Sequence, residues 1–276
     1  MRKRTRENQP ALADASNKTE HQSDGLTQSQ RLALEHVAAS ARAAHSAAQA
    51  SLQARLRSLG IDEEELVQRS SLLLAYVRSE APLIVYVPYD VVTLLLSDPF
   101  LRSQFETMRS RGTLSAGTRM GWERAMFGGH SDSAPAAERP KYGCLNICAS
   151  PLGVPSASRY GDVYITLHRS VRSRVSVTLG DSGGCHANKG AIGTLEHFAH
   201  LLVQSSNVEL QAMLAAIDGK EHGPISTVYK ELQIHGTVSI AEHVSEIALP
   251  STDRERMAPL AERFQERFQG VAVRWF

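Results

Sequence analysis

The segment Tyr229-Lys-Glu-Leu-Gln-Ile-His-Gly236 has the alternation of polar and apolar residues that is typical of a β-strand. Side chains along a strand point to opposite faces in turn, so Leu232 and Ile234 share one face. The other face carries three polar groups, Glu231, Gln233 and His235. The glycine follows where a strand can end or bend. The segment predicts either an edge strand with a solvated polar face, or a row of groups that positions and polarises a substrate.

The composition excludes several classes of protein. A chain of 276 residues can bury a sizeable core in one large domain or two small ones. Its formal net charge is +1, which gives no electrostatic case for binding nucleic acid or a membrane. No apolar run approaches the roughly 20 residues of a membrane span, and the N-terminus lacks the apolar region of a signal peptide. We therefore expect no nucleic-acid partner and no membrane partner.

The three cysteines, Cys144, Cys148 and Cys185, are too few for a closed disulfide framework. Cys144 and Cys148, with His186 as a third ligand, resemble part of a metal site. A second ligand pair at zinc-site spacing is missing from the sequence. We therefore expect no metal site, and reduced thiols.

The N-terminal residues 1–25 are polar and nearly free of large apolar groups, which predicts disorder. The short basic run Arg2-Lys-Arg-Thr-Arg6 is either solvated charge or part of a non-cleaved secretion signal. A long helix is predicted to begin near Thr27, which forms a capping-box pattern with Gln30, and to end at Gly60. A second helix is predicted from Asp62, as its cap, to Ser79.

The remainder alternates between predicted strands and helices. Residues 101–107 precede Gly112, Gly117 and Gly121, and such glycine-rich loops can approach ligands closely. Strands are predicted at 83–87, 138–146, 158–167 (after a turn), 174–179, 244–249 and 271–276, and helices at 89–96, 122–127, 194–216 and 253–269. The pattern predicts an α+β fold, with N-terminal helices packed on a mixed, mostly antiparallel split sheet.

Six motifs, in order, resemble one bacterial domain family. They are Arg102-Ser-Gln-Phe-Glu-Thr107, Trp122-Glu123 with Phe127-Gly-Gly129, Glu138-Arg-Pro-Lys-Tyr-Gly143 with Asn146, Arg159-Tyr-Gly161, Gly180-Asp-Ser182, and Glu231-Leu-Gln-Ile-His-Gly236. The family, formerly of unknown function, includes the CteC-like type III effectors, and the resemblance covers residues 27–250. It departs at Val87-Pro-Tyr-Asp90, where relatives carry a His-Pro-Asp-Arg-like run, and at Ser158, where proline is frequent.

The resemblance implies an NAD-dependent mono-ADP-ribosyltransferase that modifies a threonine of host ubiquitin and so blocks ubiquitination. It implies a monomeric effector, secreted by a type III system into the host cytoplasm. Residues 1–25 would be the secretion segment, and residues 26–276 a single ADP-ribosyltransferase-like domain. Within that domain, residues 26–80 would form a helical portion and residues 81–276 the catalytic core.

The chemistry suggests a role for each motif residue. Positive charge develops on the ribose as nicotinamide leaves, and a nearby carboxylate stabilises it. The expected catalytic residues are Glu231, with Gln233 orienting the acceptor or the ribose and Glu106 as an alternative base. Arginine forks fit phosphate oxygens, and an aromatic ring stacks on nicotinamide. The expected cofactor residues are Arg102, Ser103, Gln104, Phe105, Arg139, Tyr142, Asn146, Ser158, Arg159 and His235.

Two other functions stay open from the sequence. One is a non-catalytic module that binds ubiquitin or another host protein. The other is a hydrolase that uses Ser182 or Cys144, although Gly180-Asp-Ser182 lacks the Gly-x-Ser-x-Gly nucleophile motif. The glycine-rich segments match neither the dinucleotide fingerprint nor the P-loop spacing.

Overall fold

The computed structural model describes residues 25–108, 115–183, 191–220, 222, 225, 227 and 229–276. The predicted disorder of residues 1–24, the loop position of Gly112, and the candidate ligands Cys185 and His186 lie outside these ranges. None of the described helices is long and apolar enough to cross a membrane.

The described strands form one eight-stranded sheet in the order β10-β9-β4-β1-β3-β7-β5-β6. Its strands are β1 (Leu83–Val87), β3 (Lys141–Leu145), β4 (Val163–Leu167), β5 (Val175–Leu179), β6 (Ile192–Thr194), β7 (Lys230–Ile234), β9 (Val244–Leu249) and β10 (Ala272–Trp275). Only β9 and β10 run parallel, so the sheet is mixed and mostly antiparallel. With the helices on the N-terminal side of the chain, this confirms the predicted α+β class.

Strand β7 lies inside the sheet, between β3 and β5, and all five of its residues are buried. The interpretation of the segment as a solvated edge strand is therefore wrong. Its two faces differ as the alternation predicts. Lys230, on the face of Leu232 and Ile234, forms a fully buried ion pair of 2.8 Å with Glu209 of a helix that covers that face.

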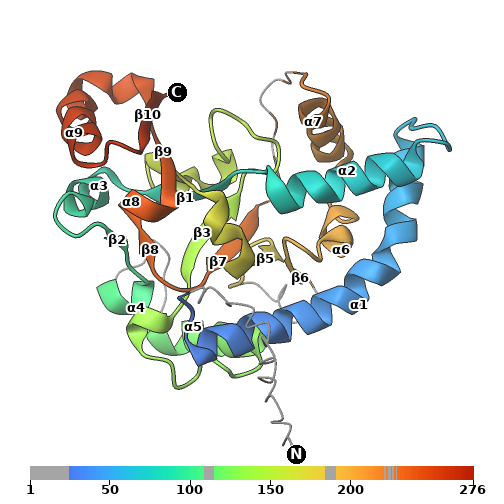
Figure 1. Cartoon of the computed structure of the whole chain (residues 1–276), viewed down its shortest axis with the longest axis horizontal. Helices are drawn as coiled ribbons and strands as arrows, with labels where there is room; N and C mark the ends of the chain where they lie inside the picture. Colours follow the sequence, from blue (N-terminus) through green and yellow to red (C-terminus); the bar gives the residue numbers. More distant parts are fainter. Residues whose placement is uncertain are drawn as a thin grey trace, which may run out of the picture.

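The N-terminal helices frame one side of the molecule. Helix α1 (Gln28–Ser58) curves along the lower and right edges of the view in Figure 1, and α2 (Leu66–Ser79) follows at its far end. The capping box of Thr27 and Gln30 is confirmed, and α1 buries part of its alanine-rich stripe. Asp62 is not the cap of α2, because a turn from Asp62 to Glu65 precedes the helix.

Two other sequence predictions are wrong. Gly117 and Gly121 belong to helix α5 (Ala116–Phe127), which Ser115 caps, so they are not loop residues. The helix predicted over 194–216 is interrupted, because residue 194 ends β6 and Ser206 starts a new helix with its own capping box. The two pieces are α6 (Ala199–Leu202) and α7 (Asn207–Ile217).

The other elements are short. They are β2 (Phe100–Leu101) and β8 (Val238–Ser239), which pair separately, the helices α3 (Tyr89–Leu95), α4 (Gln104–Thr107), α8 (Ile240–His243) and α9 (Arg254–Arg267), and the 3-10 turns η1 (Ala136–Glu138), η2 (Pro155–Tyr160), η3 (Arg169–Arg174) and η5 (Ser251–Asp253). The main apolar core joins α2, α7 and α9 to the sheet. A smaller cluster joins α1 and α5 to β6.

Candidate functional site

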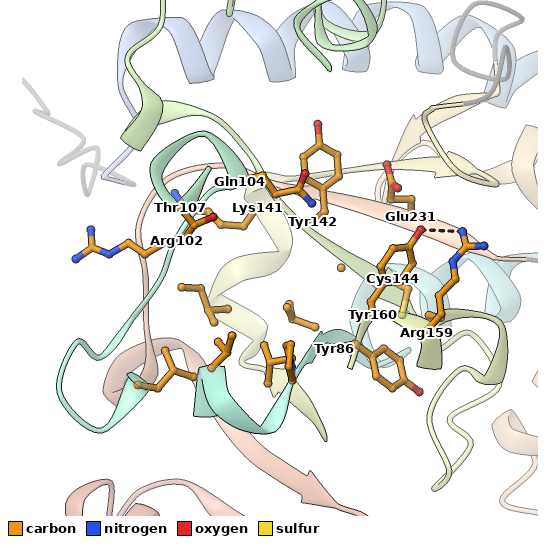
Figure 2. A pocket seen from close by; sticks show the side chains of 18 of the residues that line it. Tyr86, Arg102, Gln104, Thr107, Lys141, Tyr142, Cys144, Arg159, Tyr160 and Glu231 are labelled. Atoms are coloured by element: carbon orange, nitrogen blue, oxygen red, sulfur yellow. Dashed lines mark hydrogen bonds between the residues drawn. The ribbon is translucent and has the colours of Figure 1, made fainter. Parts of the chain in front are cut away.

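A cavity of about 1390 Å³ opens beside the middle of the sheet. Its wall is built from β1, α3, α4, α5, β3, the η2 turn and the start of β7. Five of the residues predicted from the sequence line it: Arg102, Gln104, Tyr142, Arg159 and Glu231. In Figure 2, Glu231, Tyr160 and Arg159 lie on one side of the view, and Arg102 points away on the other.

Glu231 reaches the cavity from the buried strand β7. Cys144 of β3 and Thr178 of β5 lie directly opposite it on the two neighbouring strands. Only 5% of Glu231 is exposed. Its Oε1 accepts hydrogen bonds from the Ser182 backbone N–H (3.4 Å) and from Gln233 Nε2 (3.2 Å). These bonds hold the carboxyl group in one place at the cavity wall.

Burial raises the pKa of Glu231 to about 7, because a carboxylate is poorly solvated there. The charge of Asp181 acts in the same direction. The two hydrogen bonds and the positive charge of Arg119 favour the carboxylate and limit the rise of the pKa. Glu231 therefore gains or loses its proton near neutral pH, as is frequent for acid–base groups in active sites.

Gln233 lies beneath the cavity wall and does not line the cavity. Its Oε1 accepts a hydrogen bond from Ser176 (2.9 Å), and its Nε2 donates to Thr178 Oγ1 (3.1 Å) as well as to Glu231. The amide thus orients Glu231 rather than reaching a ligand.

Glu123 of α5 holds two of the predicted residues. Its Oε2 accepts from Arg139 Nη1 and its Oε1 from the Tyr142 hydroxyl, at 2.7 and 2.9 Å. Arg139 is buried, donates to two further backbone carbonyls and lies 4.8 Å from the centre of the Phe105 ring. Arg139 and Phe105 do not line the cavity, whereas Tyr142 does. Glu123 thus ties α5 to the segment before β3 through Arg139 and to β3 through Tyr142, whose ring it fixes.

In the motif that starts at Arg102, some side chains line the cavity and others hydrogen-bond with the backbone of α4. Ser103 caps α4, and its backbone N–H donates a hydrogen bond to Glu106 Oε2 at 2.7 Å, which completes the capping box. Neither of these two side chains lines the cavity. Arg102 does, and it is paired with Asp98 (2.8 Å) and with Glu106 (3.1 Å). Gln104 also lines the cavity and lies beside Tyr142 in Figure 2.

The η2 turn brings Arg159 and Tyr160 to the cavity. The Arg159 side chain is 65% exposed and donates to the Tyr160 hydroxyl (2.8 Å), drawn as a dashed line in Figure 2. Both side chains also bond with Asp181, at 3.4 and 3.2 Å. Ser158 donates to the Pro155 carbonyl, and its side chain does not line the cavity.

Two predicted residues lie away from the cavity. Asn146 closes a turn by bonding with the backbone of Ser150 in both directions. His235 is buried with its ring centre 5.1 Å from that of Phe127. Burial, with the charges of Lys141 and Arg174, lowers the pKa of His235 to about 3. This imidazole is neutral at pH 7 and supplies no positive charge for a phosphate.

Several cavity residues had no role predicted from the sequence. Lys141, Asp181, Trp122 and Tyr160 stand inside motifs that carry the family resemblance, and Tyr229 begins the β7 segment, whereas Arg119 lies outside all of them. Arg119 precedes Trp122 by three residues, which places both on one side of a helix. That spacing was a usable signal once α5 was recognised as a full helix.

The side chains at the cavity argue against metal, cysteine and serine chemistry. Among the described residues, no group of three or more His, Cys, Asp or Glu side chains could hold a metal ion. Burial raises the pKa of the Cys144 thiol well above its usual range, which disfavours a thiolate nucleophile. In the described part of the chain, no imidazole hydrogen-bonds with Ser182. What the site does offer is a buried carboxyl group, aromatic rings and cations around one cavity.

A family model described as a protein of unknown function (DUF3626) matches residues 88–223. The match covers α3 to α7 and most of the cavity wall, while Glu231 follows it in the sequence. None of the curated proteins matches this chain.

Proposed function

We propose that this protein is an NAD-dependent mono-ADP-ribosyltransferase that transfers ADP-ribose to a threonine hydroxyl of host ubiquitin. The observation that supports this best is the position of Glu231. A buried carboxyl group with a pKa of about 7 lies at the wall of a cavity of about 1390 Å³, together with aromatic and cationic side chains.

The reaction breaks the bond between nicotinamide and ribose, and positive charge develops on the ribose as it does in glycoside cleavage. In its ionised form, Glu231 stabilises this charge and accepts a hydrogen bond from a ribose hydroxyl. Its fixed hydrogen bonds mean that little reorganisation is needed when the charge appears. Tyr142, whose ring is held by Glu123, is the candidate for stacking on nicotinamide.

The acceptor threonine is a weak nucleophile, but an electrophilic, cation-like ribose demands little activation of it. The threonine oxygen forms the new bond to the ribose carbon as the bond to nicotinamide breaks, and its proton leaves to a base. Glu231 is the ionisable group best placed to accept that proton. Positioning of the two reactants then supplies most of the rate.

Ubiquitin as the acceptor, and delivery by a type III system, rest on the motif resemblance to CteC-like effectors. Within the six motifs, Arg102, Tyr142, Arg159 and Glu231 contribute side chains to one cavity. That convergence supports a shared ligand site for residues that are far apart in the sequence.

The test is to incubate the full chain with NAD and ubiquitin and to measure the mass of intact ubiquitin. An added ADP-ribose that maps to a threonine after fragmentation is the expected result. Glu231→Gln protein is the matched control and should give little product. Unmodified ubiquitin in a stable complex would contradict the proposal and favour a non-catalytic binding module. Cleaved ubiquitin would favour a hydrolase.

A further inference from the structure

The cations that line the cavity differ in how their charge is balanced. Arg102 pairs with Asp98 and Glu106, and Arg159 bonds with Tyr160 and Asp181. Lys141 donates from Nζ to the carbonyls of residues 137 and 236, at 3.2 and 3.0 Å. Arg119 stands apart: none of the described residues forms an ion pair or a hydrogen bond with its guanidinium, although its side chain lines the same cavity.

Arg119 is nonetheless buried, with only 8% of its surface exposed. Its guanidinium carbon lies 4.7 Å from the centre of the Tyr142 ring and 5.8 Å from that of Trp122. Glu123, one turn later on α5, uses its two oxygens for Arg139 and Tyr142. The nearest carboxylate along the helix is therefore already engaged, and aromatic rings hold the Arg119 side chain in place.

The charges of Glu123 and Glu231 act on Arg119 at longer range, but no carboxylate forms a hydrogen bond or ion pair with its guanidinium among the described residues. Burying a cation without such a direct partner is unfavourable unless another group supplies the missing interactions. A guanidinium stacked on aromatic rings keeps its N–H edge available for two parallel hydrogen bonds to phosphate oxygens. We propose that Arg119 is the anion anchor of the cavity and binds the phosphate groups of its ligand. That the ligand is NAD, with its pyrophosphate on Arg119, rests on the proposed function.

The anchor is also placed to act together with Glu231. Both groups line the cavity, and the positive charge of Arg119 favours the Glu231 carboxylate, so the two groups influence each other electrostatically. A ligand that carries phosphate at one end and a sugar at the other can meet both groups at once. Arg159 and Arg102 are more exposed and already have partners. We therefore assign them no part in the anchor.

The experiment is isothermal titration of the full chain with inorganic pyrophosphate and, separately, with ADP-ribose, which lacks the nicotinamide and cannot be turned over. Arg119→Gln should weaken both affinities about 10- to 100-fold, because it removes charged hydrogen bonds to phosphate. Arg119→Met keeps an unbranched apolar side chain but lacks the guanidinium that lies over the Tyr142 ring, and should show the same loss. The matched control is Arg124→Gln, on the same helix, whose exposed side chain pairs with Asp132; its affinities should stay within about twofold of wild type.

Thermal unfolding without ligand separates an anchor from a structural arginine. If Arg119 is an anchor whose burial is unfavourable without ligand, the midpoints of both Arg119 variants should stay the same or rise. A large fall in both would assign Arg119 to the fold and overturn the proposal. Wild-type protein that binds neither probe, or variants that bind both as wild type does, would also overturn it. If both probes bind through Arg119 but NAD gives no modified ubiquitin, the proposed transferase function fails while the anchor stands.

Discussion

Gln233 donates a hydrogen bond from Nε2 to Oε1 of Glu231 over 3.2 Å, although both side chains come from the same strand. The amide is held from the other side by hydroxyl groups of β5. A glutamine in this network cannot rotate without leaving buried polar atoms unpaired, which is costly. The network therefore determines the position of the Glu231 carboxyl group before any ligand arrives.

Replacing Gln233 with Met should disturb catalysis through Glu231. The variant keeps the length of the side chain but removes the donor that favours the carboxylate, so the pKa of Glu231 should rise above its wild-type value of about 7. The pH profile of kcat/KM for NAD should shift to higher pH, with unfolding easier by about 1–3 kcal/mol. Ser176→Ala, which contacts Gln233 and not Glu231, is the control and should leave the pH profile in place. An unshifted profile in Gln233→Met would mean that the amide does not tune Glu231.

Glu231→Gln should lower turnover far more than it weakens NAD binding. The carboxylate acts on charge that develops in the transition state, and loss of one such group typically costs about a hundred- to a thousandfold in rate. Single-turnover transfer to ubiquitin, measured beside an NAD titration, checks this. Equal rates in variant and wild type would remove Glu231 from the mechanism and leave Glu106, which accepts the Ser103 N–H bond in the capping box of α4, as the next candidate.

Activity should rise with pH through about 7. Glu231 acts as a carboxylate, and in the free protein its pKa is raised to about 7. The profile of kcat/KM reports the free enzyme, so it should increase below pH 7 and level off above it. A profile that is flat between pH 6 and 8 would contradict the assignment.

The same group links stability to pH, and the sign is definite. The folded pKa is raised from 4.5, so the stabilising contribution is complete below pH 4.5 and is lost as the pH rises through 7. Glu231→Gln lacks this loss. Its unfolding free energy should therefore gain about 2–3 kcal/mol relative to wild type between pH 4 and pH 8. Denaturant titrations at the two pH values measure the difference, and a constant gap would argue for an ordinary pKa.

Replacement of Arg139 by Ala should lower stability, whereas replacement of Arg159 by Ala should lower NAD affinity. Arg139 is the buried partner of Glu123, and removing one member of a buried pair typically costs about 3–5 kcal/mol. Arg159 is exposed, and its surface pair contributes about 0–1 kcal/mol. Thermal midpoints should fall strongly for the first variant and hardly for the second, while NAD affinity should fall for the second. Equal midpoints would contradict a structural role for Arg139.

Removing residues 1–24 should leave the transfer rate of the purified protein unchanged. The described contacts begin at Leu26, which is buried, and at Thr27, which caps α1 and donates to Glu138 at 2.8 Å. Thr27→Ala in the full chain should by contrast lower stability by about 1 kcal/mol. Rate and thermal midpoint of the two proteins are the measurements. A slow truncated enzyme would show that the N-terminal residues take part in the chemistry.

The alternation of β7 predicted which side chains share a face, but it could not predict the depth of the strand. Edge and central strands have the same local pattern, and only pairing with β3 and β5, distant in sequence, separates them. The same limit explains the helix predicted over 194–216. Its apolar spacing is helical, but the capping box at Ser206 begins a second helix within the predicted range.

The arginines show why site residues are harder to predict than elements. Arg139 stood in a family motif and Arg119 did not, yet the first is paired inside the fold and the second lines the cavity. The difference depends on Glu123, whose oxygens face Arg139 and Tyr142. Which cation meets a buried carboxylate is set by packing between α5 and β3, and no local pattern in the sequence records it.

The buried pair of Lys230 and Glu209 has a consequence for how this chain can diverge. Lys230 is the residue just before Glu231, and its pair with α7 lies on the face of β7 away from the cavity. A lineage that loses either charge alone breaks this buried ion pair and leaves the remaining charge uncompensated by it, which is strongly unfavourable. In homologous sequences the two positions should therefore covary, switching together to an apolar pair or remaining together as Lys and Glu.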